Sequence, residues 1–286
     1  MKLIWPGNTL DFSEKTCIMG VLNVTPDSFS DGGLHFDLGK AVDHAVRLVK
    51  DGADIIDIGG ESTRPGSREV ALDEELRRTI PVIEALVSKI RVPISIDTYK
   101  AEVAKRALDV GASIVNDISG LRFDPGMAEV IASRGVPVII MHIKGTPRDM
   151  QSNPRYEALI PEIMDYLRVS IGIATDAGID GHRIIIDPGI GFGKTFDHNL
   201  QIMKHLEEFA LLQKPIAVGV SRKAFIGKIL GGASPEDRLE GTSAAVAIAI
   251  FNGAHIVRVH DVKEMARVAK VADAIKKGRM GPAQLS

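Results

Sequence analysis

The sequence predicts an α/β protein built as a single (β/α)8 TIM barrel that spans residues 1–286 and carries a short N-terminal extension. Eight apolar runs rich in isoleucine and valine recur along the chain, and roughly 20 to 46 residues separate them, which is enough for a crossover helix. Five of these runs follow a glycine suited to the left-handed position that ends a helix. No Ser/Pro-rich linker divides the chain, so a single closed barrel is favoured over an open sheet.

The expected strands, in chain order, are 17–25, 53–60, 93–98, 113–118, 137–142, 183–189, 215–221 and 255–262. The first 16 residues precede the first strand, and we expect a small hairpin or lid over the bottom of the barrel. After Asp37, apolar residues recur at three-and-four spacing, which predicts a helix packed on the sheet. Segment 241–253 is apolar nearly all round if helical, which predicts burial against the barrel and against a second subunit.

The glycines that predict the helix-to-strand joints are Gly52, Gly111, Gly135, Gly178 and Gly253. Each stands between a predicted helix and a strand, where a positive φ reverses the chain at little steric cost.

The composition is that of an ordinary globular protein, with 45% hydrophobic residues, 25% charged residues and a net charge of −2. This balance, with one tryptophan, three tyrosines and nine phenylalanines, gives no electrostatic or stacking case for nucleic acid or a membrane surface. The single Cys17 excludes an internal disulfide, and no common zinc motif is present. We therefore expect a cytoplasmic protein that binds small molecules.

Polar side chains gather where the predicted strands end. They are Asn23, Thr25, Asp57, Glu61, Asp97, Asn116, Asp117, His142, Asp187, Ser221, Arg258, His260 and Asp261. The carboxyl ends of barrel strands form the active-site rim in this fold, although any one of these residues could instead cap a turn. Arg258 and His260 share one face of their strand because side chains alternate along a strand. Arg258 as a salt-bridge partner and His260 as a structural histidine remain open alternatives.

The run GIGFGKT at 189–195 looks like a phosphate-binding loop but fails both nucleotide motifs. Pro188 stands where the P-loop needs glycine, and Lys194 stands where GxGxxG needs its last glycine. The glycines instead predict a shaped loop on which Phe192 covers a flat ligand, or a merely flexible loop.

Two segments, GVLNVTPDSFSDGG at 20–33 and DIGGESTRPGS at 57–67, resemble the signature loops of the dihydropteroate synthase family, the sulfonamide target of folate synthesis. The resemblance continues in family order through SIDT at 95–98, NDISG at 116–120, DPGIGFGK at 187–194, GVSRKAFIG at 219–227 and RVHDV at 258–262. It implies a TIM barrel, usually a homodimer, that joins 7,8-dihydropterin-6-ylmethyl diphosphate to 4-aminobenzoate. Pyrophosphate leaves with the assistance of Mg²⁺, by ionisation before attack.

The resemblance also implies residue roles. The pterin would be bound by Asp97, Asn116, Asp187 and Lys223 between Met141 and Phe192. The diphosphate would be bound by Thr63, Arg258, His260 and Asn23, and Asn23 would also contact Mg²⁺. The 4-aminobenzoate pocket would contain Phe29, Arg64, Pro65 and Ser221, beside Lys223. The catalytic set would be Arg258, His260, Asp31 and Lys223, with Asp31 and Arg64 securing two closing loops, 25–33 and 59–67.

One departure from the family pattern is Ala224, where many members carry serine or threonine after the lysine. We expect a weaker contact to the 4-aminobenzoate carboxylate there, although the following helix N-terminus still offers N–H groups.

Three other functions compete with this interpretation. A methyltetrahydrofolate-dependent methyltransferase shares the pterin-binding barrel but expels no diphosphate, so Arg64 and the Arg258-x-His260 pair favour the synthase. A catalytically silent pterin-binding protein would be expected to lose anion-site residues, and none is missing. An aldolase would need a Schiff-base lysine, for which Lys223 is the obvious candidate.

Overall fold

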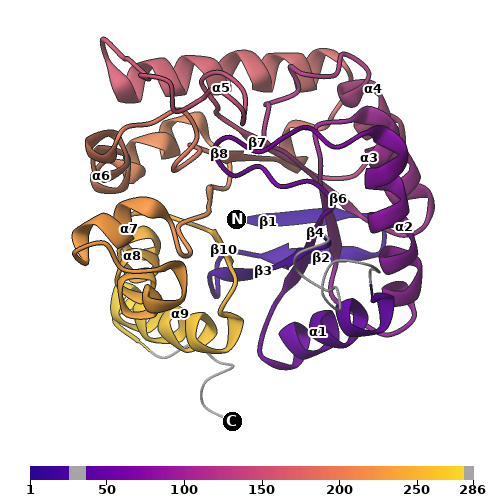
Figure 1. Cartoon of the computed structure of the whole chain (residues 1–286), viewed down its shortest axis with the longest axis horizontal. Helices are drawn as coiled ribbons and strands as arrows, with labels where there is room; N and C mark the ends of the chain where they lie inside the picture. Colours follow the sequence, from indigo (N-terminus) through magenta and orange to yellow (C-terminus); the bar gives the residue numbers. More distant parts are fainter. Residues whose placement is uncertain (26–36, 280–286) are drawn as a thin grey trace.

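The computed structural model describes residues 1–25 and 37–279 as one parallel barrel surrounded by helices (Figure 1). The barrel strands are β3 (Cys17–Asn23), β4 (Ile55–Gly59), β5 (Ile94–Asp97), β6 (Ile114–Asp117), β7 (Val138–Met141), β8 (Ile184–Asp187), β9 (Ala217–Val218) and β10 (Ile256–Val259). They pair in the order β8-β7-β6-β5-β4-β3-β10-β9, and a parallel bridge between Ile186 and Ile216 joins the two ends. The predicted (β/α)8 barrel is confirmed.

The helices follow the strands in sequence and form the outer ring. They are α1 (Leu38–Lys50), α2 (Leu72–Val87), α3 (Ala101–Asp109), α4 (Met127–Arg134), α5 (Leu159–Asp176), α6 (Phe196–Lys204), α7 (Ala224–Ile229), α8 (Leu239–Phe251) and α9 (Val262–Lys277). Short 3₁₀ turns lie at Gly181–Arg183, Leu206–Leu212 and Pro235–Asp237. Asp37 caps α1 by accepting a hydrogen bond from the Lys40 N–H, as expected for a helix that begins there.

All five glycines at the predicted helix-to-strand joints have positive φ angles, between 61° and 116°. L-residues pay a steric penalty in that region, so glycine ends each helix and admits the next strand without strain. The strand–helix repeat can therefore be recognised in the sequence, because the same positive-φ glycine recurs at five helix-to-strand joints.

The N-terminal extension forms a hairpin of β1 (Lys2–Trp5) and β2 (Asn8–Asp11) across the bottom of the barrel. Leu3, Trp5 and Leu10 enter the main core from one face of this hairpin, as period-two alternation requires. The Arg183 guanidinium, just before β8 begins, donates to the Ile4 carbonyl at 3.4 Å. The expected hairpin is confirmed, and it closes the end of the barrel opposite the polar rim.

Candidate functional site

The carboxyl ends of the strands bring Asp57, Asp97, Asn116, Asp187 and Arg258 to one mouth of the barrel. The backbone register places them there, since Asp97 on β5 pairs with Asn116 on β6 and with Gly59 on β4. All four acceptor residues are nearly or fully buried. The polar rim predicted from the strand ends is therefore one continuous site.

Arg258 lies at the centre of this site and is held by two carboxylates. Its Nε donates to Asp57 Oδ2 at 2.6 Å, and its Nη2 donates to Asp97 Oδ2 at 2.7 Å. Asp57 and Asp97 raise the pKa of the guanidinium although burial acts against its charge. A cation held by two fixed bonds cannot turn away from a ligand, so its charge is pre-organised.

Asp97 and Asn116 supply acceptors next to that cation. Burial raises the pKa of Asp97, Arg258 opposes the rise, and the nearby Asp57 adds to it. Asn116 Nδ2 donates to Asp57 Oδ2 at 3.2 Å, which turns the amide oxygen of Asn116 the other way. This orientation leaves an acceptor for the N–H groups of a flat heterocycle.

Asp187 and Lys223 form the second polar part of the site. Asp187 Oδ1 accepts the Gly189 N–H at 2.7 Å, and burial raises the pKa of Asp187 to about 6. Burial lowers the pKa of Lys223 to about 8, with Asp187 opposing the change. Lys223 Nζ lies 4.4 Å from the centre of the Phe192 ring, a cation–π contact.

Met141 and Phe192 border this part of the pocket with apolar surface. Met141 ends β7 and belongs to a small buried cluster, against which Phe192 packs. The structure thus brings together all six residues assigned to the pterin from the sequence.

His260 follows β10 and contacts Ser221 at the end of the neighbouring strand. The His260 backbone N–H donates to Ser221 Oγ at 3.2 Å, and His260 Nδ1 lies 3.0 Å from the same Oγ. Two contacts to one hydroxyl fix the orientation of the His260 ring against Ser221. Burial, and next Arg258, lower the pKa of His260 to about 3. His260 is therefore neutral at pH 7 and offers hydrogen-bonding nitrogens rather than a charge.

Arg222 ties the loop that carries Ser221 and Lys223 to the end of β10. It adopts a positive φ of 59°, and its Nε donates to Asp261 Oδ2 at 3.0 Å. The Ser221–Lys223 turn is thereby fixed against the strand that carries Arg258 and His260.

Thr63, Arg64 and Pro65 lie on the segment between β4 and α2. Thr63 is half-buried, whereas Arg64 and Pro65 are exposed. The tip of this segment meets the segment after β7, where the Gly66 N–H donates to the Pro147 carbonyl at 3.0 Å. Asn23 is half-buried at the end of β3, opposite Gly59 in the register. Phe29 and Asp31, assigned to the 4-aminobenzoate pocket and to loop closure, lie outside the described residues.

Two features of the site have no role in the sequence-based assignment. Asp57, noted only as a rim residue, is fully buried and accepts from both Arg258 and Asn116. Lys194 is buried beneath the glycine loop, and its Nζ lies 2.6 Å from His142 Nδ1. Burial lowers the pKa of both side chains, that of His142 to about 2. Lys194 thus holds the end of β7 to the loop after β8. Its buried position agrees with the conclusion from the sequence that this run is not a phosphate-binding loop.

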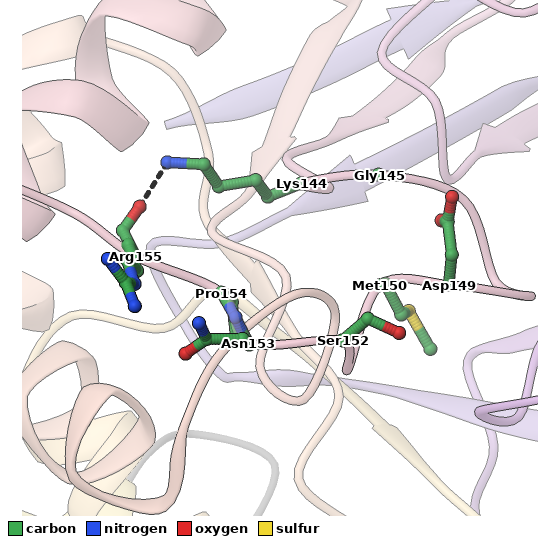
Figure 2. Close-up of a pocket in the computed structure, with 8 residues that line it drawn as sticks. All are labelled: Lys144, Gly145, Asp149, Met150, Ser152, Asn153, Pro154 and Arg155. Carbon is green, nitrogen blue, oxygen red and sulfur yellow. Dashed lines mark hydrogen bonds between the residues drawn. The ribbon is translucent and has the colours of Figure 1, made fainter.

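Figure 2 shows a pocket on the segment after β7, lined by Lys144, Gly145, Asp149, Met150, Ser152, Asn153, Pro154 and Arg155. Lys144 Nζ donates to the Arg155 carbonyl across it. Gln151 Nε2 donates to the Gly191 carbonyl at 2.6 Å, which joins this segment to the glycine loop. The polar groups here shape the segment that borders the site.

A set of buried acceptors beside apolar side chains and a fixed cation, at the mouth of a parallel barrel, is what a pterin-binding enzyme needs. The sequence profile of the family described as Pterin binding enzyme matches residues 19–260. A dihydropteroate synthase of Bacillus subtilis is 51% identical, with 94% of this chain and 91% of that protein covered. The chain belongs to the dihydropteroate synthase family.

Solved structures agree with this assignment. A Yersinia pestis dihydropteroate synthase in complex with a sulfonamide drug has a TM-score of 0.92 at 44% identity, covering 97% of this chain and 100% of that one. A Xanthomonas albilineans dihydropteroate synthase in complex with 7,8-dihydropteroate has a TM-score of 0.87 at 41% identity, covering 96% and 99%. These matches favour the synthase over the methyltransferase and aldolase alternatives.

Proposed function

We propose that the chain joins 7,8-dihydropterin-6-ylmethyl diphosphate to 4-aminobenzoate in folate synthesis, and that the bond to the diphosphate breaks first. The observation that carries this proposal is the Arg258 guanidinium, fixed by Asp57 and Asp97 beside the pterin pocket. The C–O bond electrons leave with pyrophosphate, the pterin methylene becomes a cation, and the neutral arylamine attacks it. The amine then loses a proton to solvent.

Substrate recognition follows from the acceptors and the one donor of the pocket. Asp97, Asn116 and Asp187 offer oxygens to the 2-amino and ring N–H groups of the pterin, and Lys223 donates to its oxo and ring nitrogen acceptors. A ligand without the matching groups leaves these buried atoms unpaired, at a cost of about 1–3 kcal/mol each.

Leaving-group stabilisation rests on one cation and neutral donors. Arg258 is charged throughout the working pH range, and the neutral His260 ring, which Ser221 holds at Nδ1, lies close to it. Both groups are positioned before the reaction, so they favour separated pyrophosphate over the bound ester. Thr63, half-buried on its loop, adds a hydroxyl donor.

We infer that Mg²⁺ assists at the diphosphate. Among the described residues, no cluster of three His, Cys, Asp or Glu side chains is arranged to hold a metal ion. Mg²⁺ commonly takes one or two protein ligands and fills its other positions with water and substrate phosphates. The amide oxygen of Asn23, half-buried at the end of β3, fits that limited demand. When bound, the ion would neutralise charge on the leaving pyrophosphate.

The direct test is to incubate the purified protein with the pterin diphosphate, 4-aminobenzoate and Mg²⁺. We expect pyrophosphate and dihydropteroate in equal amounts, the first measured by an enzyme-coupled assay and the second by chromatography. EDTA should suppress both products, and Asn23→Ala should raise the Mg²⁺ concentration needed for half-maximal rate. Pyrophosphate without any dihydropteroate, even with saturating 4-aminobenzoate, would refute the proposed transfer.

We also propose that the chain is a cytoplasmic homodimer. Support comes from an exposed apolar surface on adjoining helices: Ile229, Leu230, Ile248, Phe251, Val271 and Ile275. They belong to α7, α8 and α9, except Leu230, which directly follows α7, and α8 packs against the other two helices. Exposed apolar surface of this extent in one region is typical of a subunit interface. Cys17 is a free, buried thiol, which suits a reducing compartment. In the described residues, no helix is long and apolar enough to cross a membrane.

Light scattering tests the dimer. Ile248→Glu and Phe251→Glu, at side chains 51% and 57% exposed, should halve the molar mass because they place buried charges in the interface. Val169→Glu on α5, at a residue 55% exposed and away from α8, is the matched control and should leave the mass unchanged. A wild-type monomer at micromolar concentration would exclude the interface.

A further inference from the structure

One buried ammonium group holds both ends of the segment between β4 and α2. Lys100 Nζ donates to Glu61 Oε2 at 2.5 Å, at the start of this segment, and to the Val70 carbonyl at 2.8 Å, at its end. Its third bond goes to Glu75 Oε2 on α2, at 2.6 Å. An ammonium has three protons, so each contact uses one of them.

The contacts of Lys100 lie in the protein interior. The side chain of Lys100 is 13% exposed, that of Glu61 is 6% exposed and that of Glu75 is 1% exposed. Two carboxylates face one ammonium, and Glu75 Oε1 is buried without a hydrogen-bond partner. A buried ionic cluster of this kind contributes little net stability compared with apolar packing. The cluster is better explained by its geometry, because its hydrogen bonds hold the segment between β4 and α2 in one position.

The same cluster connects to the pterin pocket. Tyr99 OH donates to Glu61 Oε1 at 2.6 Å, so both oxygens of Glu61 are bound by neighbouring residues. Tyr99 and Lys100 follow β5, which ends at the pterin residue Asp97. The Tyr99 ring also packs against the buried cluster of Met141. One short stretch of chain therefore positions an acceptor for the pterin and anchors the loop above it.

We propose that Lys100 is a positioning residue for segment 61–70, which carries Thr63, Arg64 and Pro65. It sets the binding of 4-aminobenzoate and the alignment of its amine, while leaving pterin binding to the strand ends. This inference rests on the proposed function and extends it to a residue that touches no substrate. With both ends of the segment held at one nitrogen, the spacing between its ends is fixed for residues 62–69.

Lys100→Met keeps most of the side-chain volume and removes the three bonds. We expect the KM for 4-aminobenzoate to rise about tenfold or more, because small displacements of positioning groups are costly. The dissociation constant for pterin-6-carboxylic acid, used as a pterin probe, should stay within about twofold of wild type, since its contacts lie on the strands. Lys100→Arg, which keeps the cation and several donors, should restore much of the loss.

A second measurement reports on the loop without any turnover. Arg68 is a trypsin site within the segment, whereas the bond after Arg64 resists trypsin because Pro65 follows it. We expect cleavage there to speed up about tenfold in Lys100→Met, because release of the base opens the segment locally. Lys105→Met on α3, which loses only a 4.0 Å surface pair with Glu102, is the matched control and should change neither readout.

The outcomes separate the two proposals. Equal losses of pterin affinity and 4-aminobenzoate KM, or unchanged KM and proteolysis in a folded Lys100→Met variant, would overturn the role of Lys100. If that variant fails to fold, Glu61→Gln must show the same split between KM and pterin binding, or the inference is wrong. A wild-type protein that makes no dihydropteroate would refute the proposed function, while trypsin cleavage and pterin binding would still test the anchor.

Discussion

Replacing Arg258 by alanine should lower kcat by about a thousandfold, the upper range for loss of one pre-organised donor in a buried site. The guanidinium is the fixed cation beside the leaving diphosphate, so its effect appears chiefly in the transition state. Arg258→Lys should recover part of the rate because it restores charge without the two-pronged geometry. Steady-state kinetics with the pterin diphosphate as varied substrate measures both variants.

Pterin binding by the Arg258 variants provides the control. Arg258 also holds Asp97, so we expect a smaller loss of affinity, about tenfold, when Asp97 is left without its partner. Removing the cation from two buried carboxylates should also cost about 3–5 kcal/mol of unfolding free energy, measurable by urea denaturation. If pterin affinity falls as far as kcat, Arg258 serves ground-state binding and its role in pyrophosphate departure is wrong.

Asp187→Asn should weaken pterin binding by about tenfold to a hundredfold, the equivalent of a charged hydrogen bond. Asparagine still accepts the Gly189 N–H, so the glycine loop keeps its shape and the loss reports on the ligand. Titration calorimetry with pterin-6-carboxylic acid measures it. Asp176→Asn, at an exposed residue that ends α5, is a matched control. An unchanged dissociation constant would contradict the pterin assignment of Asp187.

The carboxyl group of Asp187 also determines how pterin affinity changes with pH. Burial raises the pKa of Asp187 to about 6, and its protonated form no longer offers two acceptor oxygens. Pterin affinity should therefore fall as the pH drops below about 6, by up to tenfold per unit. Asp187→Asn should remove the part of this dependence near pH 6 and leave the part due to Asp97, whose pKa burial also raises.

Much of the architecture was predictable from local features of the sequence. Positive-φ glycines, apolar strand runs and the capping residue Asp37 act within a few residues of where they stand, so spacing alone reveals them. Period-two alternation likewise predicted that Arg258 and His260 share a face. The resemblance to the family then assigned roles that spacing cannot provide.

The contacts that organise the site were not predictable because they join distant segments. Asp57 and Arg258 lie 201 residues apart in the sequence. They meet because β4 and β10 are both neighbours of β3 in the closed barrel, so that only one strand stands between them. The neutral state of His260 depends on burial and on Arg258, neither of which its neighbours in sequence reveal. Lys100 follows a strand without any motif, and its partners come from α2 and from the segment between β4 and α2.

The plugged lower end of the barrel has a consequence for the order of events during turnover. Leu3, Trp5 and Leu10 fill that end, so reactants and products share a single doorway at the rim. Under the proposed function, the heterocycle would rest on the floor formed by the strand tips, and the arylamine would lie under segment 61–70, nearer the exit. This arrangement predicts that the heterocycle binds before the arylamine.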